Sequence, residues 1–358
     1  MKILIDCRSA GKPQTGIGMY INGLVSHLKN TENQYILLCY DKYNIHNLNG
    51  LEFKYLRVKR RNKHFENQIV VPYMAYKEQV DLFHVTHHDV FPILYLKKVI
   101  ISVMDIFWID HENESSPLFK FLFYSLSRIA FHRANHIITI SNHTKLSLEK
   151  KMDINPKKVE AILISCHEKF SRTNDRNIRY LDNVEPYIFY NGSSAKRKNL
   201  KIFEKIDDKL KDLNVLINFV LVTKKTGKFD EDLSSLYDRK NFIIDSKDYR
   251  IDELREFYTR SLAFIFPSKY EGFGLPVLEA IKCGTIPIIS KTTSLPEIVL
   301  GDSDFIVDPE DYEAISEKII RIINDVKYKE YLRKKLNDIS ESFNWTISSS
   351  RTELLYEL

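Results

Sequence analysis

The sequence predicts an α/β protein with two doubly wound domains, each a parallel sheet covered by helices on both faces. The chain has 358 residues, which suits two domains of about 100–200 residues each. Short apolar runs alternate with segments of helical periodicity, and this alternation favours a parallel sheet. The pattern restarts near residue 186, after a polar segment over 167–186 that lacks periodicity and predicts a linker. We therefore place one domain over 1–168 and a second over 185–342.

The elements can be assigned in order along both halves. In the first half, strands are predicted over 2–6, 34–40, 81–85, 98–105 and 136–141, and helices over 17–28, 119–132 and 142–152. In the second half, strands are predicted over 186–192, 215–223, 242–245, 263–268 and 285–290, and helices over 200–213, 252–260, 276–283 and 311–324. The strand runs are largely apolar, as expected for strands buried on both faces.

Composition narrows the class of protein. Hydrophobic residues make up 44% and aromatic residues 12% of the chain, which excludes a disordered protein. The four cysteines lie far apart and form no C-x-x-C pair, so we expect neither disulfides nor a zinc site, and a reducing compartment. The apolar run at the N-terminus is too short for a signal peptide, and no segment resembles a spanning helix. We expect a cytoplasmic protein.

The net charge of +5 is modest, but one basic run is dense. It comprises Arg57, Lys59, Arg60, Arg61 and Lys63. A solvated loop is one interpretation. The other is contact with anionic lipid head groups, where each cation contributes about 1 kcal/mol. No nucleic-acid-binding module surrounds the run, so nucleic acid is not an expected partner.

In open parallel sheets, ligands bind outside the carboxyl ends of the strands, and three motifs fall there. The first is TGIGMY over 15–20, where Gly16 and Gly18 would let backbone N–H groups approach an anion at a helix start. A dinucleotide fingerprint needs a third glycine three residues after the second, and Ile21 stands there instead. A plain turn remains the alternative.

The second motif is GSSAKRKNL over 192–200, between a predicted strand and a predicted helix. Three consecutive cations, Lys196, Arg197 and Lys198, oppose the helix dipole at this end. A bound phosphate would compensate them through charge-assisted hydrogen bonds. The motif therefore indicates a phosphate site, with a solvated basic turn as the alternative.

The third motif is EGFGLPVLE over 271–279. Glu271 follows a buried strand, the glycines allow close approach of the backbone to a ligand, and Pro276 suits the first turn of a helix. Glu279 then falls about one turn into that helix. The two carboxylates could face one cleft, or they could be a helix-capping residue and a surface residue.

Together these motifs resemble those of family-4 (group 1) retaining glycosyltransferases with the GT-B fold, of the bacterial surface-polysaccharide type. EGFGLPVLE matches their E-x(seven)-E pattern, with FPS before it and Ala280, Gly284 and Pro287 after it. Further matches are SLPE over 294–297, ANHIITISNHTK over 134–145, RKNL over 197–200 and FNW over 343–345. The resemblance covers the chain from about residue 2 to its end. It implies two Rossmann-like domains facing a cleft, with a final helix over 343–358 crossing back to the N-terminal domain.

The resemblance also implies roles for single residues. Glu279 would bind the ribose, Glu271 the transferred sugar, and Lys198 the diphosphate. Arg197 would supply a second cation, because Ser193 stands where many relatives carry a basic residue. The candidate catalytic residues are Glu271, Lys198 and Asp105. The candidate donor-binding residues are Gly16, Gly18, Arg197, Lys198, Phe273, Gly274, Leu275 and Glu279, and those of the 273–275 loop would act through backbone N–H groups.

In such a scheme, fixed cations and backbone donors meet the charge that grows on the leaving diphosphate. No metal or other cofactor is expected. Retaining glycosidases often use two carboxylates about 5 Å apart, one of them a nucleophile. Here the acids are divided between sugar and ribose, and the resemblance implies front-face attack with the departing phosphate as base.

The expected partners are a nucleotide-sugar donor and a glycan acceptor, lipid-linked as in relatives that build O-antigen or capsule. The RKNL and TGIG motifs favour GDP-mannose. Many relatives carry a histidine at the position of Met104, where it contacts the sugar near its 6-hydroxyl, so Met104 suggests a 6-deoxy donor instead. The basic run with Phe65, Ile69, Val70 and Tyr73 would suit peripheral membrane attachment. Alternatives are a nucleotide-sugar epimerase or a non-catalytic sugar-nucleotide-binding subunit.

Overall fold

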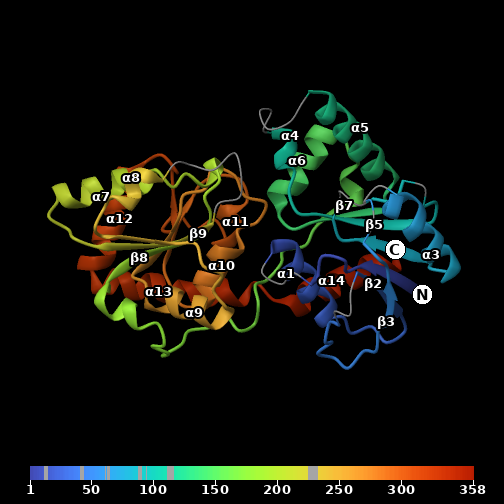
Figure 1. Cartoon of the computed structure of the whole chain (residues 1–358), viewed down its shortest axis with the longest axis horizontal. Helices are drawn as coiled ribbons and strands as arrows, with labels where there is room; N and C mark the ends of the chain where they lie inside the picture. Colours follow the sequence, from blue (N-terminus) through green and yellow to red (C-terminus); the bar gives the residue numbers. More distant parts are fainter. Residues whose placement is uncertain are drawn as a thin grey trace. The chain divides into compact units, whose positions relative to one another are not determined.

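The computed structural model describes residues 1–11, 15–40, 44–60, 62, 65–87, 91–93, 95–110, 117–224 and 233–358, except the side chains of 110 and 117–122. The chain forms two compact units. The first comprises Met1–Ser165 with Phe343–Leu358, and the second comprises Cys166–Ser342. In Figure 1 each unit is a sheet with helices on both of its faces, so the predicted doubly wound α/β class is confirmed.

The first unit contains a parallel sheet of seven strands in the order β3-β2-β1-β4-β5-β6-β7. The strands are β1 Lys2–Asp6, β2 Gln34–Cys39, β3 Lys54–Arg57, β4 Leu82–Val85, β5 Lys98–Val103, β6 His136–Thr139 and β7 Val159–Ala161. The helices are α1 Gly16–Ser26, η1 Glu66–Val70, α3 Val71–Lys77, α4 Phe107–Asp110, α5 Pro117–Arg133, α6 Asn142–Met152, η3 Pro156–Lys158 and α14 Trp345–Glu357.

The central strands are buried on both faces, which is why they read as continuous apolar runs. The edge strand β3 is exposed at both ends and half-buried in the middle, and β7 has only three residues. Neither edge strand was predicted, because a short strand with one partner carries little apolar signal. The segment η1–α3 was also not predicted as helix.

The second unit contains a parallel sheet in the order β10-β9-β8-β11-β12-β13. Its strands are β8 Tyr187–Ser193, β9 Asn218–Lys224, β10 Phe242–Asp245, β11 Ala263–Phe266, β12 Pro287–Ser290 and β13 Ile306–Val307. Its helices are η4 Arg179–Asn183, η5 Lys196–Lys198, α7 Ile202–Asp212, α8 Ser234–Tyr237, α9 Ile251–Arg260, α10 Leu275–Lys282, α11 Leu295–Ile298, α12 Tyr312–Asn324 and α13 Val326–Glu341. The sequence did not predict α13, whose polar and charged residues outnumber its apolar ones.

The segment that follows β7 differs from the predicted linker. Residues from Cys166 to Ser342 belong to the second unit. The backbone N–H groups of Asn177 and Ile178 donate to the Glu256 carboxylate at 2.9 Å. Arg260 joins the same network through ion pairs with Glu256 at 2.8 Å and Asp182 at 2.6 Å. This segment was predicted as a linker because it is polar, but its polar groups bind α9.

The final helix α14 packs on the first unit, as the resemblance implied. Tyr356 hydrogen-bonds His84 Nδ1 at 2.7 Å inside the core. Trp345 lies against Gly23 of α1, where a Cβ atom would come within 2.1 Å of the indole ring. Only a residue without a side chain allows this contact between the two helices.

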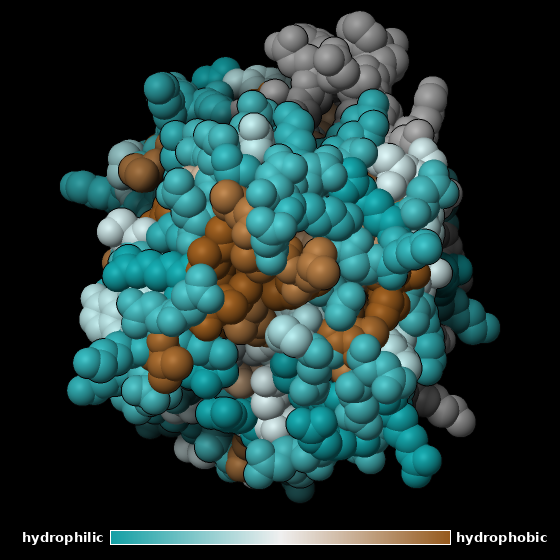
Figure 2. All heavy atoms as spheres, turned by 90° about the vertical axis from the view of Figure 1, so that its left-hand side faces the viewer, coloured by the Kyte–Doolittle hydropathy of each residue, from teal (hydrophilic) through white to brown (hydrophobic). Residues whose placement is uncertain are grey.

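No helix within the described residues is both long and apolar enough to cross a membrane. Figure 2 views the side of the second unit that carries α7 and α8, and it shows a mostly hydrophilic surface with an apolar patch near its centre.

Candidate functional site

The strand order of the second sheet sets the position of the candidate site. Chain order runs outward from β8 in both directions, to β9 and β10 on one side and to β11, β12 and β13 on the other. The strands β8 and β11 are neighbours, and the chain leaves them toward opposite sides of the sheet. Doubly wound sheets bind ligands at the carboxyl ends of such a pair of strands. The backbone N–H of Lys269 donates to the Arg197 carbonyl at 2.7 Å and joins the loops after β8 and β11. The second and third motifs of the sequence thus lie together.

Lys198 and Glu271 form the centre of this site. Their side chains make an ion pair and are each about nine-tenths buried. The Lys198 ammonium also lies 5.0 Å above the Phe266 ring. Arg197 Nη1 lies 3.5 Å from the other Glu271 carboxylate oxygen and donates to the Tyr270 carbonyl at 3.0 Å.

The surroundings of Glu271 keep it ionised. Burial acts to raise its pKa, but the charges of Lys198 and Arg197 outweigh burial and hold the pKa below its ordinary value. Two cations share this one carboxylate, so the cluster has an excess positive charge. An anionic ligand could compensate that charge.

The loop after Glu271 is shaped by its glycine. Gly274 has φ +111° and precedes the first residue of α10. A Cβ atom here would meet Leu295 Cδ2 at 2.6 Å, so both conformation and space require glycine. Pro276 occupies the first turn of α10, where no intrahelical N–H bond is lost. These residues start the helix directly behind the 273–275 loop.

A following segment supports the same loop. The Ser294 hydroxyl lies 2.9 Å from the Glu271 carbonyl and 3.0 Å from the Phe273 carbonyl. Thr293 Oγ1 accepts from the Glu271 N–H at 3.0 Å. The SLPE motif thus begins with a serine that braces the backbone of the EGFGLPVLE loop.

Glu279 lies within α10 and is buried. Burial raises its pKa to about 7, and a hydrogen bond from Tyr258 opposes this shift. Tyr258 donates to Glu279 Oε2 at 2.8 Å and accepts from Asn191 Nδ2 at 3.1 Å. Sequence patterns did not indicate Tyr258 or Asn191, because their contacts join residues distant in the chain.

The other predicted residues lie in the first unit. Gly16 and Gly18 begin α1, and Thr15 Oγ1 accepts from the Gly18 N–H at 3.1 Å. The predicted anion donor at Gly18 is therefore already used in capping the helix. Asp105 follows β5 and accepts from the Phe107 N–H at 3.1 Å. The neighbouring Met104 is buried.

A charged cluster in the first unit was also not predicted. Arg8 is buried after β1, with Asp6 at 2.6 Å and Asn67 Oδ1 at 2.7 Å, and it also pairs with Glu66. Glu66 and Asn67 belong to the π-helix η1, a form that often marks functional sites. The cluster binds η1 to the carboxyl end of β1.

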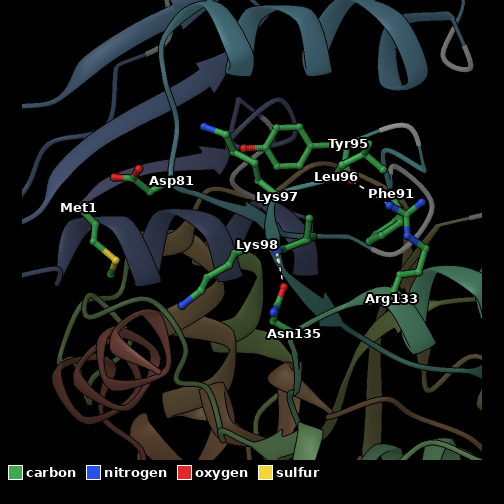
Figure 3. Close-up of a pocket in the computed structure, with 10 residues that line it drawn as sticks. Met1, Asp81, Phe91, Tyr95, Leu96, Lys97, Lys98, Arg133 and Asn135 are labelled. Carbon is green, nitrogen blue, oxygen red and sulfur yellow. Dashed lines mark hydrogen bonds between the residues drawn. The ribbon is translucent and has the colours of Figure 1, made fainter.

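Figure 3 shows a depression of the first unit at the amino ends of β4 and β5. The loops that follow the strands leave from the other, carboxyl ends. The depression has a volume of about 770 Å³ and is lined by residues that include Lys97, Lys98 and Arg133. Lys97 Nζ donates to the Val80 carbonyl at 2.8 Å, and Arg133 donates to the Tyr95 carbonyl at 3.2 Å. Two of its cations thus donate to carbonyl groups of the chain's own backbone.

Known proteins resemble this chain in sequence and in fold. Residues 171–338 match the family described as glycosyl transferases group 1. The chain is 37% identical over 107 residues to the O-antigen chain mannosyltransferase B of Escherichia coli, covering 30% of this chain and 28% of that protein. It is 25% identical over 243 residues to the O-antigen chain mannosyltransferase RfbU of Salmonella typhimurium, covering 66% and 63%. The chain thus spans less than a third of the length of the first of these relatives.

Solved structures show the same architecture across the whole chain. The sucrose-phosphate synthase of Thermosynechococcus elongatus has a TM-score of 0.75 at 16% identity, covering 100% of this chain and 98% of that one. HepE of Anabaena, solved in complex with UDP, has a TM-score of 0.75 at 14% identity, covering 100% of both chains.

The two parallel sheets with their helices have the GT-B fold of these solved structures. Within it, residues 171–338 match the group 1 glycosyl transferase family.

Proposed function

We propose that this protein is a family-4 retaining glycosyltransferase that moves a hexosyl or 6-deoxyhexosyl unit from a nucleotide-sugar to a glycan acceptor. The observation that carries the proposal is the Lys198–Glu271–Arg197 cluster, which lies where two loops of a group 1 domain diverge. The cluster combines buried cations for a diphosphate with an ionised carboxylate for a sugar hydroxyl.

We propose that these residues bind the donor. Lys198 and Arg197 meet the diphosphate, and backbone N–H groups of Phe273, Gly274 and Leu275 add donors at the start of α10. Negative charge grows on the diphosphate as the glycosidic bond breaks, and preorganised cations stabilise that charge. Glu279 binds the ribose hydroxyls from within the same helix.

The chemistry then needs no protein nucleophile. Glu271 is ion-paired to two cations, which lowers its reactivity toward the anomeric carbon, and Glu279 is held by Tyr258. We favour front-face attack, with the departing phosphate accepting the proton of the acceptor hydroxyl. Asp105 of the first unit remains a candidate catalytic residue. The scheme uses no metal or other cofactor, so transfer is expected to persist in a chelator.

The donor and acceptor are proposed from the relatives. Two relatives are O-antigen chain mannosyltransferases, which supports GDP-mannose as donor and O-antigen or capsule synthesis as the process. HepE was solved with UDP-glucose, so a uridine donor is the second candidate. The apolar Met104 keeps a 6-deoxy sugar in the test set, because a methionine cannot donate a hydrogen bond to a 6-hydroxyl.

We also propose a lipid-linked acceptor, met at the inner face of the cytoplasmic membrane. Arg57, Lys59 and Arg60 are exposed, whereas Arg61 and Lys63 lie outside the described residues. Phe65, which precedes η1, and Ile69 and Tyr73 of η1–α3 have exposed side chains, and Val70 is half-buried. Cations beside exposed aromatic and aliphatic groups are typical of peripheral attachment to anionic lipid.

The test is incubation of the protein with a panel of radiolabelled nucleotide sugars and a lipid extract. Transfer to lipid supports the proposal, epimerised donor indicates an epimerase, and binding alone indicates a non-catalytic subunit. Lys198→Ala is expected to abolish transfer. Lys196→Ala, which removes a cation from the same turn, is the matched control and should retain most activity.

A further inference from the structure

The Glu279 carboxylate ends a short chain of hydrogen bonds. Asn191, near the carboxyl end of β8, donates its amide to the Tyr258 hydroxyl at 3.1 Å. Tyr258 in turn donates to Glu279 Oε2 at 2.8 Å. Each bond in such a chain polarises the next, so the Asn191 amide strengthens Tyr258 as a donor.

The Tyr258 ring is fixed in place by its neighbours. It lies edge-on to Phe189 at 5.0 Å, Phe264 at 5.3 Å and Phe170 at 6.0 Å between ring centroids. The side chain is fully buried. The hydroxyl therefore has one position, and the carboxylate oxygen that accepts from it is fixed as well.

The second carboxylate oxygen has a different environment. None of the described residues hydrogen-bonds Glu279 Oε1, while Oε2 is held by Tyr258. A carboxylate can accept several hydrogen bonds, so Oε1 keeps its acceptor capacity for a ligand. The two neighbouring hydroxyl groups of a ribose can donate hydrogen bonds to a carboxylate oxygen that is held in one orientation.

We propose that Tyr258 is the positioning residue of the nucleotide site: supported by Asn191, it fixes Glu279 so that Oε1 accepts from the ribose hydroxyls. This inference rests on the proposed function and assigns a role to a residue outside the sequence motifs. Without Tyr258, Glu279 would be ordered only when the nucleotide binds, at a cost in affinity.

The charge of Glu279 depends on the same contact. Burial raises its pKa to about 7 and the Tyr258 bond lowers it, so removing the hydroxyl should move the pKa further upward. The groups around it are Tyr258 from α9, Cys283 at the end of α10 and Cys166 from the preceding segment. Burial raises the pKa of both thiols, which keeps them neutral. The positive charge of Arg255 opposes the effect of burial on the pKa of Cys283.

The experiment compares wild-type protein with Tyr258→Phe by calorimetry, using UDP, GDP, ADP and CDP and their 2′-deoxy forms. The variant should bind the preferred ribonucleotide about tenfold more weakly, the effect expected for a hydrogen bond to a charged group. Its affinity for the deoxy form should change little, because that ligand uses Glu279 less. Turnover at saturating donor should stay within about twofold of wild type, since the reacting atoms are untouched.

Tyr187→Phe is the matched control. Tyr187 is also buried in the second unit, and its hydroxyl donates to the Phe257 carbonyl at 2.8 Å rather than to a carboxylate. This variant should bind ribonucleotide and deoxynucleotide as wild type does. A pH series adds a second readout: the pH at which wild-type binding falls should move upward in Tyr258→Phe and not in the control.

Two results would overturn the inference. If Tyr258→Phe discriminates ribose from deoxyribose as wild type does, with the same pH profile, Tyr258 does not position Glu279, although the proposed function would stand. If wild-type protein binds none of the nucleotides, the proposed function fails as well. Should Tyr258→Phe not fold, Asn191→Ala decides the matter, with a smaller loss of ribonucleotide affinity expected in the same direction and an unchanged affinity overturning the inference.

Discussion

The ammonium of Lys198 is ion-paired with Glu271, a carboxylate of the same unit. Both side chains are buried, and the Phe266 ring lies under the ammonium at 5.0 Å. A diphosphate that approaches Lys198 therefore competes with a carboxylate of the chain itself. Glu271 has two opposed effects. It holds the cations in place, and it also weakens their electrostatic attraction for the diphosphate of the donor.

Glu271→Gln should separate these effects. We expect pyrophosphate and nucleoside diphosphates to bind about tenfold more tightly, because Lys198 and Arg197 lose their internal counter-ion. Transfer should slow by about 100-fold or more, because the sugar loses a charged acceptor. Calorimetry and steady-state transfer assays measure the two quantities.

The control is Glu310→Gln, which breaks the exposed ion pair between Lys269 and Glu310 at 2.6 Å. Exposed pairs contribute little, so both quantities should stay near wild type. Weaker diphosphate binding by Glu271→Gln would show that the carboxylate mainly organises the cations.

Glu279→Gln should lower the affinity for nucleoside diphosphates and raise the free energy of unfolding at high pH. The folded-state pKa of Glu279 is raised to about 7 from 4.5, so the native state binds more protons than the unfolded state between these values. The free energy of unfolding therefore falls as pH rises through this window, by an amount on the order of 3 kcal/mol. An uncharged glutamine removes that loss.

Thermal unfolding at pH 5 and pH 8 measures this effect. The variant should gain stability relative to wild type at pH 8 and little at pH 5, while its affinity for nucleoside diphosphates drops about tenfold. An equal change in melting temperature at both pH values would contradict the assignment of the raised pKa. Glu279→Ala should weaken nucleotide binding more than it slows turnover at saturating donor.

Gly274→Ala should destabilise the loop behind the site. The added Cβ meets Leu295 at 2.6 Å and Ile298 at 2.9 Å, and the residue has φ +111°. We expect a loss of about 2–4 kcal/mol in the free energy of unfolding, from strain and overpacking together. Denaturant unfolding monitors the change.

Gly301→Ala is the matched control, because Gly301 also has a positive φ, +76°, yet nothing lies within 4 Å of its Cβ position. Only the conformational cost of about 1 kcal/mol should remain there. Equal losses in both variants would mean that contact with α11 plays no part.

Membrane attachment predicts a charge-dependent flotation result. Wild-type protein should float with anionic liposomes, and neutralising Arg57, Lys59, Arg60, Arg61 and Lys63 together should abolish this, at about 1 kcal/mol for each cation. Tyr73→Ser should weaken the attachment, because it removes an exposed ring. Liposomes of neutral lipid are the control, and retained binding of the neutralised variant would remove the proposal.

Much of the fold could be predicted from the sequence because buried parallel strands are continuous apolar runs. The predicted helix over 142–152 matches α6, and that over 276–283 differs from α10 by one residue at each end. The edge strands β3 and β7 and the two-residue β13 were missed, because short, partly exposed strands lack that signal.

The site was predictable only where residues lie close in the chain. The Glu271 and Glu279 spacing could be read directly, whereas the Lys198–Glu271 pair joins residues 73 apart. The contact from Asn191 to Tyr258 spans 67 residues, and no motif marks either one. The Lys198–Glu271 contact depends on the strand order, which brings the β8 and β11 loops together, and the Asn191–Tyr258 contact depends on how α9 packs against β8.

The position of α14 affects the order in which the chain can fold during synthesis. Residues 166–342 are continuous, so the second unit can fold once they have left the ribosome. The first unit, although synthesised earlier, lacks Trp345 against Gly23 and Tyr356 against His84 until α14 has emerged. At translation rates of about 5–20 residues per second, the roughly 190 residues after Ser165 take on the order of 10–40 seconds. During that time we expect the apolar groove for α14 to be open, and a nascent chain stalled before residue 343 should be the form that chaperones bind.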